Sequence, residues 1–86
     1  MRHVEVFSRD NCPYCDRAKA LLKSKGVDYD EIDITYDETM AARMMQRSAQ
    51  RSVPQIFIGN RPIGGYDALA RLNAKGELNQ MLGING

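Results

Sequence analysis

At the start of this chain a strand pattern runs directly into a helix pattern, and two cysteines stand at the junction. Residues 3–8 alternate valines with a glutamate and predict a strand. Residues 13–25 carry apolar side chains at helical spacing, and Gly26 follows as a typical residue just past a helix end. The pattern therefore predicts a helix that begins after Cys12 and holds Cys15 in its first turn.

The middle of the chain repeats this order. Residues 29–35 predict a second strand, parallel to the first because a whole helix lies between them. Asp37 or Thr39 is expected to open a second helix that runs to about Ser48. We expect three methionines to form the buried side of that helix: Met40, Met44 and Met45.

The last third predicts an antiparallel hairpin followed by helices. Residues 55–58 and 61–63 form the two strands, with a tight turn at 59–60. Pro62 cannot donate a backbone hydrogen bond, so its strand belongs at a sheet edge. One helix is expected near Asp67 and a short one near the C-terminus. The sum is an α/β fold, a four-stranded mixed sheet flanked by helices on both faces.

Length and charge narrow the possible partners. Eighty-six residues predict one domain, residues 1–86. A net charge of +1 argues against nucleic acid or an anionic membrane as the main partner. The N-terminal residues lack the apolar core of a signal peptide, and no stretch approaches the roughly 20 apolar residues of a membrane span. We therefore expect a cytoplasmic protein.

The segment Cys12-Pro13-Tyr14-Cys15 predicts redox chemistry. At a helix N-cap, Cys12 would lie at the positive end of the helix dipole, which stabilises its thiolate. The positive charge of Arg9 could add to this effect. An N-cap side chain points out of the helix end, so Cys12 is predicted as the nucleophile. Cys15 is then the resolving thiol, which attacks a mixed disulfide on Cys12.

Two other uses of the cysteines compete with this one. A zinc site needs about four ligands, and the chain offers two cysteines and one distant histidine, His3. A purely structural pair is the second alternative. A C-x-x-C motif near a βαβ pattern is itself a redox signal, so the catalytic interpretation is favoured and no metal site is expected.

Three motifs in order resemble the dithiol glutaredoxins, and the short bacterial type in particular. Residues 12–15 follow the first strand, Ser52-Val53-Pro54 precedes the third, and residues 64–67 open a late helix. The family commonly has threonine at the position of Ser52, where the hydroxyl is kept. The resemblance implies a thioredoxin fold and a monomer that reduces protein disulfides and glutathionylated proteins. Glutathione would be a co-substrate, with no tightly bound cofactor.

The resemblance also implies a glutathione site. Tyr14 would flank the tripeptide, and Arg9 would meet its glycine carboxylate. A cis Val53–Pro54 bond would aim the Val53 backbone at the cysteine of glutathione. The remaining predicted contacts come from the loop before the third strand and from the late helix start: Arg51, Ser52, Gly65, Tyr66 and Asp67.

Some of these residues have simpler interpretations. Asp67 could be an ordinary helix N-cap after a glycine turn, without any ligand. Arg43 and Arg47 are expected on a solvated helix face, whereas Arg51 is the member of that stripe placed to touch a ligand.

Two alternative functions stay open from the sequence. The first is a [2Fe–2S] carrier in which Cys12 of two chains and two glutathiones hold the cluster. The second is a thioredoxin-like donor reduced by an NADPH-dependent flavoprotein.

Overall fold

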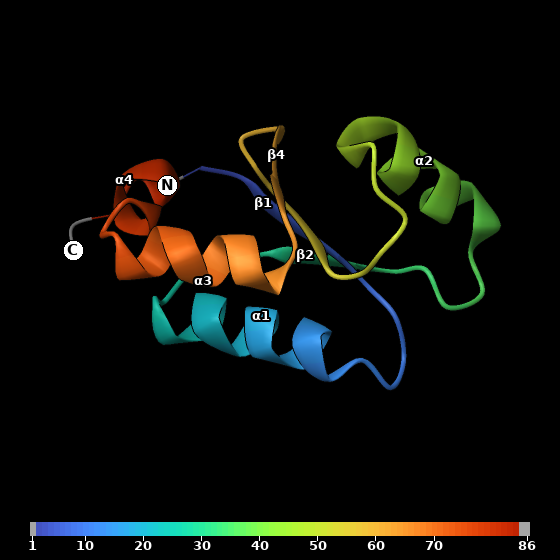
Figure 1. The fold of residues 1–86 in the computed structure, drawn as a ribbon, viewed down its shortest axis with the longest axis horizontal. Coiled ribbons are helices and arrows are strands. Elements are labelled where there is room, and N and C mark those ends of the chain that lie inside the picture. The colour runs from blue at the N-terminus through green and yellow to red at the C-terminus, as the bar shows by residue number, and fades with distance from the viewer. Residues whose placement is uncertain (1, 85–86) are drawn as a thin grey trace.

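The computed structural model describes residues 2–84 and shows one mixed sheet between two layers of helices (Figure 1). The strands are β1 (Val4–Ser8), β2 (Asp30–Asp33), β3 (Gln55–Ile58) and β4 (Arg61–Gly64). The helices are α1 (Pro13–Ser24), α2 (Glu38–Ser48), α3 (Tyr66–Ala74) and α4 (Leu78–Leu82). The predicted α/β architecture is confirmed.

The sheet has the strand order β2-β1-β3-β4. β1 pairs in parallel with β2 and antiparallel with β3, and β3 and β4 form the predicted hairpin. Gly59 and Asn60 in its turn have φ angles of 57° and 67°, the left-handed conformation that tight hairpins require. Pro62 lies in edge strand β4, where its missing N–H costs no ladder bond.

Alternate residues of the central strands serve two separate cores. Val4, Val6, Ile56 and Ile58 pack into the larger core, under α1, α3 and α4. Phe7 packs edge-to-face against Phe57 in the smaller core beneath α2, with a centroid distance of 5.5 Å. In Figure 1, α1 and α3 run side by side on one face of the sheet, while α2 lies on the other. The period-2 pattern of a strand thus supplies both layers.

Two details differ from the sequence prediction. Met44 is buried and Met40 is half-buried, but Met45 is 37% exposed, so its predicted burial is wrong. The second strand covers Asp30–Asp33 and not residues 29–35, and just beyond its end the Asp33 carboxylate accepts hydrogen bonds from the backbone N–H and the hydroxyl of Thr35. These bonds turn the chain away from the sheet and hold the pKa of Asp33 below its usual value.

Arg47 is exposed, as predicted, but it also attaches α2 to the sheet. Its guanidinium lies 4.1 Å from the centroid of the Phe57 ring. It also forms a two-pronged pair with the Glu5 carboxylate on β1, at 2.7 and 3.3 Å. Arg43 is exposed, as predicted. Position on a helix wheel does not reveal such a contact, because Glu5 and Phe57 come from distant parts of the sequence.

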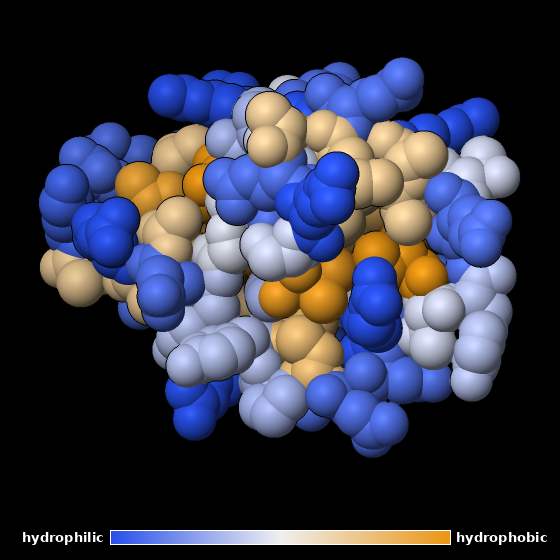
Figure 2. Space-filling model, turned by 45° about the vertical axis from the view of Figure 1, so that its right-hand side comes forward, coloured by the Kyte–Doolittle hydropathy of each residue, from blue (hydrophilic) through white to orange (hydrophobic). Residues whose placement is uncertain are grey.

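On the side drawn in Figure 2, apolar side chains are visible at several places between hydrophilic ones. Among the helices of residues 2–84, none has the length and apolar character needed to cross a membrane.

Candidate active site

Cys12 caps the N-terminus of α1, as the sequence predicts. Its backbone is extended, and Pro13 occupies the first helical position. The backbone N–H of Cys15 donates to Cys12 Sγ at 3.2 Å. A sulfur that accepts from a free helical N–H lies where the helix dipole favours negative charge. The local sequence thus places a reactive sulfur at this helix end.

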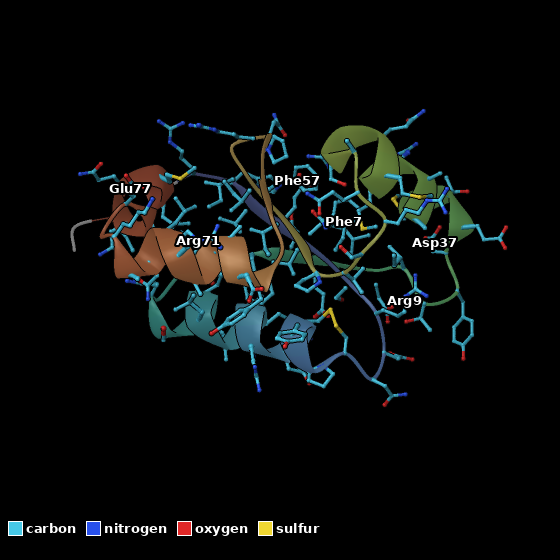
Figure 3. The ribbon with its side chains drawn as sticks, viewed as in Figure 1. Phe7, Arg9, Asp37, Phe57, Arg71 and Glu77 are labelled. Atoms are coloured by element: carbon cyan, nitrogen blue, oxygen red, sulfur yellow. A yellow bond between two sulfur atoms is a disulfide. The ribbon has the colours of Figure 1, made fainter. Side chains whose placement is uncertain are left out.

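Cys12 and Cys15 form a disulfide, with Cα atoms 5.2 Å apart. The two sulfurs differ in exposure: Cys12 is half-buried, whereas Cys15 is 1% exposed and belongs to the core side of α1. In Figure 3 the disulfide is the yellow bond at the start of α1, at the end of the molecule where Arg9 is labelled. An attacking molecule therefore reaches Cys12 first.

The loop before β3 lies against this sulfur. Cys12 Sγ is 4.0 Å from the carbonyl oxygen of Val53. The Val53–Pro54 peptide bond is cis, which confirms that prediction. Within residues 2–84, the Val53 amide makes no hydrogen bond to the protein. An extended peptide placed beside Cys12 would find this backbone free to pair.

A glycine turn forms the opposite wall. Gly64 has a φ angle of 115°, which side-chain-bearing residues rarely adopt, and a Cβ there would lie 3.2 Å from that of Ala68. A Cβ on Gly65 would lie 3.5 Å from the Pro54 carbonyl oxygen. The turn thus brings the start of α3 close to the Val53–Pro54 loop.

Between these walls lies a hollow of about 440 Å³, within the usual range for small-molecule sites. Its lining comes from α1, the loop before β3, the end of β4 and the first turns of α3. The lining residues are Tyr14, Gln50, Ser52, Val53, Pro54, Ile63, Gly64, Gly65, Tyr66, Asp67, Ala68 and Arg71.

Most predicted ligand contacts converge on this hollow. Seven of them line it: Tyr14, Ser52, Val53, Pro54, Gly65, Tyr66 and Asp67. Arg9 and Arg51 are exposed and lie outside the lining, so their contact with a ligand stays a prediction. Sequence reasoning missed Gln50 and Arg71. Arg71 follows Asp67 by four residues, a spacing that puts both on one helix face and could have revealed it.

The start of α3 has no side-chain cap. Gly65 is the N-cap and forms no capping hydrogen bond. Asp67 is the second residue of the helix. The interpretation of Asp67 as an ordinary N-cap is therefore wrong. The first backbone N–H groups of α3 belong to residues that line the hollow, and within residues 2–84 they have no hydrogen-bond acceptor, as at anion-binding helix ends.

Tyr14 is held over the hollow by its neighbours although it is 54% exposed. Its ring centroid lies 6.2 Å from that of Tyr66. The guanidinium of Arg17, which is also on α1, lies 5.1 Å from the centroid of the Tyr14 ring. The ring is therefore positioned as one wall of the hollow.

Gln55 anchors the loop that carries Val53. Its buried amide nitrogen donates to the backbone carbonyl of Ser52 at 2.9 Å, and also to the Gln50 side chain at 3.3 Å. Both partners line the hollow. A single buried side chain at the start of β3 thus fixes two points of the site wall.

Comparison with known proteins decides the family. A family model described as Glutaredoxin matches residues 4–63. Glutaredoxin 3 of Escherichia coli (strain K12) is 46% identical over 82 residues, which cover 95% of this chain and 99% of that protein. This chain belongs to the glutaredoxin family. The resemblance inferred from the three sequence motifs is confirmed.

Solved glutaredoxin structures agree with the fold. A buckwheat glutaredoxin in complex with glutathione has a TM-score of 0.87 and 34% identity, covering 95% of this chain and 77% of that one. The glutaredoxin of Brucella melitensis has a TM-score of 0.84 and 44% identity, covering 95% and 89%. The predicted thioredoxin fold is confirmed, and the chain is a thiol–disulfide oxidoreductase with Cys12 and Cys15 as its redox pair.

In this glutaredoxin fold, a polar network joins α1 to the sheet. Ser8 is buried at the end of β1 and donates to Glu31 at 2.7 Å, and Lys19 on α1 donates to the same carboxylate at 2.9 Å. The hydrogen bond from Lys19 is the main cause that lowers the pKa of Glu31, and it also raises the pKa of Lys19. The network ties the helix that carries both cysteines to β1 and β2.

Glu31→Gln is expected to lower the free energy of unfolding by about 0.5–1 kcal/mol near neutral pH, a value typical of an ion pair that solvent partly screens. The Glu31 side chain is 40% exposed, so a larger loss is not expected. Because folding lowers the Glu31 pKa, the pair contributes fully above the ordinary value of 4.5 and is lost as pH falls through the folded value. Urea unfolding of both proteins across this range measures it, and a difference that grows in acid would contradict it.

No group of three or more His, Cys, Asp or Glu side chains arranged to hold a metal ion occurs in the part of the chain that the structure describes.

Proposed function

We propose that this thiol–disulfide oxidoreductase takes its electrons from glutathione and reduces glutathionylated proteins and protein disulfides as a monomer. One observation carries the proposal. The Cys12 sulfur lies at an open helix end, 4.0 Å from the Val53 carbonyl, beside a hollow of about 440 Å³ that ends at the uncapped start of α3. A ligand that fills this hollow needs a central thiol and an anionic end.

Glutathione meets both demands. Its cysteine would lie extended along Val53, pairing with the free backbone N–H and C=O, so that its sulfur faces Cys12. Its γ-glutamyl carboxylate would receive the N–H groups at Tyr66 and Asp67. The Asp67 carboxylate would pair with the ammonium group, which a plain anion lacks.

The other end of the tripeptide needs a cation for its glycine carboxylate. Arg51 and Arg9 are the candidates from the sequence, and both are exposed near the two loops that flank Cys12. Tyr14 would cover the middle of the ligand, because its ring forms a wall of the hollow. The buckwheat glutaredoxin–glutathione complex, a relative at 34% identity, supports this choice of ligand.

The chemistry proceeds by thiol–disulfide exchange. The Cys12 thiolate attacks the glutathione sulfur of a mixed disulfide, and the protein cysteine leaves as a thiolate that takes up a proton. A free glutathione thiolate then attacks the glutathione bound to Cys12, which forms glutathione disulfide and returns the Cys12 thiolate. With a protein disulfide, the Cys12 thiolate first attacks one sulfur and forms a mixed disulfide with the substrate. The Cys15 thiolate then attacks the Cys12 sulfur, and the reduced substrate leaves as a thiolate that takes up a proton. Two glutathiones reduce the resulting Cys12–Cys15 disulfide and become glutathione disulfide.

The electron donor provides the direct test. We expect glutathione to reduce the Cys12–Cys15 disulfide at least about 10-fold faster than NADPH with a thioredoxin-reductase-type flavoprotein, since the hollow offers tripeptide-sized contacts. Stopped-flow measurement of both rates at matched donor concentrations gives the comparison. A preference for the flavoprotein would overturn the donor assignment and favour a thioredoxin-like donor.

A further inference from the structure

A second hollow of about 240 Å³ adjoins the first, between β4 and α3. We name it the β4–α3 groove. It is lined by Arg61, Pro62, Ile63, Ala68, Arg71, Leu72, Lys75 and Met81. Three of these, Ile63, Ala68 and Arg71, line the first hollow too. Arg71, labelled on α3 in Figure 3, therefore stands at the junction, and the groove continues the site described above.

The groove combines a basic rim with an apolar floor. Arg61, Arg71 and Lys75 are exposed cations, and no carboxylate is among the lining residues that belong to the described part of the chain. Within residues 2–84, none of the three lies within ion-pair distance of an acid, whereas Lys19 and Arg47 are both paired. Unpaired cations around apolar side chains complement an acidic segment that also carries an apolar side chain.

The dimensions indicate a polypeptide rather than a second small molecule. At about 240 Å³ the groove falls below the usual small-molecule range and suits one or two side chains. Asp67 and Lys75 are eight residues apart, which is about 12 Å along a helix. An extended chain covers that length with about four residues. A segment of about four residues that passes the start of α3 could therefore follow the helix as far as Lys75.

Side chains, not an added strand, would recognise that segment. β4 is the exposed edge of the sheet, the usual place for strand addition. Pro62 in the middle of β4 has no N–H to offer, and the ladder is already irregular between Ile56 and Phe57. The Arg and Lys side chains carry the recognition.

We infer that the β4–α3 groove binds the segment of a protein substrate next to its target cysteine, and that this segment carries one or two acidic side chains and an apolar one. The inference rests on the proposed function, because it assumes a substrate sulfur at Cys12. The groove would make the enzyme select among glutathionylated proteins by the sequence around the modified cysteine, in a salt-dependent way.

The test compares three mixed disulfides of glutathione. The first is a peptide of about ten residues with Glu and Leu on both sides of its cysteine, a length that reaches along α3. The second is the same peptide with Gln for Glu, and the third is cysteamine, which is too small to reach the groove. The groove variant is Arg61→Gln with Lys75→Gln. The matched control, Lys23→Gln with Arg43→Gln, removes two exposed cations on α1 and α2 and gives the same net charge.

We expect wild type to prefer the acidic peptide by about 10-fold in kcat/KM at low salt, a factor within reach of two or three exposed ion pairs. The preference should fall to about 2-fold in the groove variant and toward unity in about 1 M salt. The control should keep it, and all proteins should turn over the cysteamine disulfide equally. A wild type that treats both peptides alike would overturn the groove while leaving the proposed function intact.

A second readout does not depend on turnover. The acidic peptide with serine for its cysteine should shift the amide signals of Arg61, Ile63 and residues 71–75 in the ¹⁵N spectrum of the oxidised protein. If no mixed disulfide is reduced, the proposed function fails and these shifts alone decide the groove. The groove proposal would be overturned by signal shifts confined to other elements. It would also be overturned if the groove variant showed the same shifts as wild type.

Discussion

Cys12→Ser is expected to abolish the reduction of glutathionylated proteins, with a loss of at least about 1,000-fold in kcat/KM, whereas Cys15→Ser keeps a substantial part of it. Cys12 Sγ is the sulfur at the helix end beside the hollow, and a serine hydroxyl there is a far weaker nucleophile. Cys15 is buried and, in the proposed mechanism, acts only after Cys12 has reacted. A second glutathione can replace it in that later step.

Both variants should be measured with a glutathionylated peptide, excess glutathione and a coupled assay for glutathione disulfide. Circular dichroism of each variant serves as the folding control, because Cys15 contributes to the core side of α1. Two results would contradict the mechanism: activity retained without the Cys12 sulfur, or activity lost to the same extent in both variants.

Phe57→Ala is expected to reduce the free energy of unfolding by about 3–5 kcal/mol, the usual cost of truncating a buried phenylalanine. Phe57 is 1% exposed and takes part in the contacts that hold α2 on the sheet. Its ring packs on Phe7 and lies under the Arg47 guanidinium, and it belongs to the same core cluster as Met44. Small domains have a total stability of about 5–15 kcal/mol, so this loss is a large fraction.

Guanidinium unfolding monitored by far-UV circular dichroism measures the change. Phe57→Leu is the matched control, which keeps most of the volume and should cost less than about 1.5 kcal/mol. Arg47→Met would separate the cation–π contact from the burial of the ring. A Phe57→Ala variant that loses less than about 1 kcal/mol would show that α2 is held mainly by other contacts.

Local patterns account for what could be predicted. Pro13 fits the first turn of α1 and Gly26 the end of that helix, so the position of Cys12 as N-cap follows from neighbours within a few residues. The turn at Gly59 and Asn60 is local in the same sense. The resemblance to a family added the cis bond before Pro54, which no local preference would have favoured.

Contacts between distant segments account for the rest. The sequence could not show that Arg47, although exposed as predicted, would also contact Phe57 and Glu5, because Arg47 and Glu5 are 42 positions apart in the sequence. Met44 and Met45 are the same residue type, so residue type does not tell them apart. The side of α2 on which each one lies decides that Met44 is buried and Met45 is exposed. Arg71 shares a helix face with Asp67, but its place between the two hollows depends on how β4 packs against α3.

By itself, the amino-acid order determined the strands, the helices and the sulfur at the mouth of α1, since each depends on backbone preferences and capping within a few positions. Only the tertiary structure decided which loops close around that sulfur and which cations stay without partners. Those outcomes depend on how the two helical layers pack on one sheet, and packing joins residues that the linear pattern keeps apart.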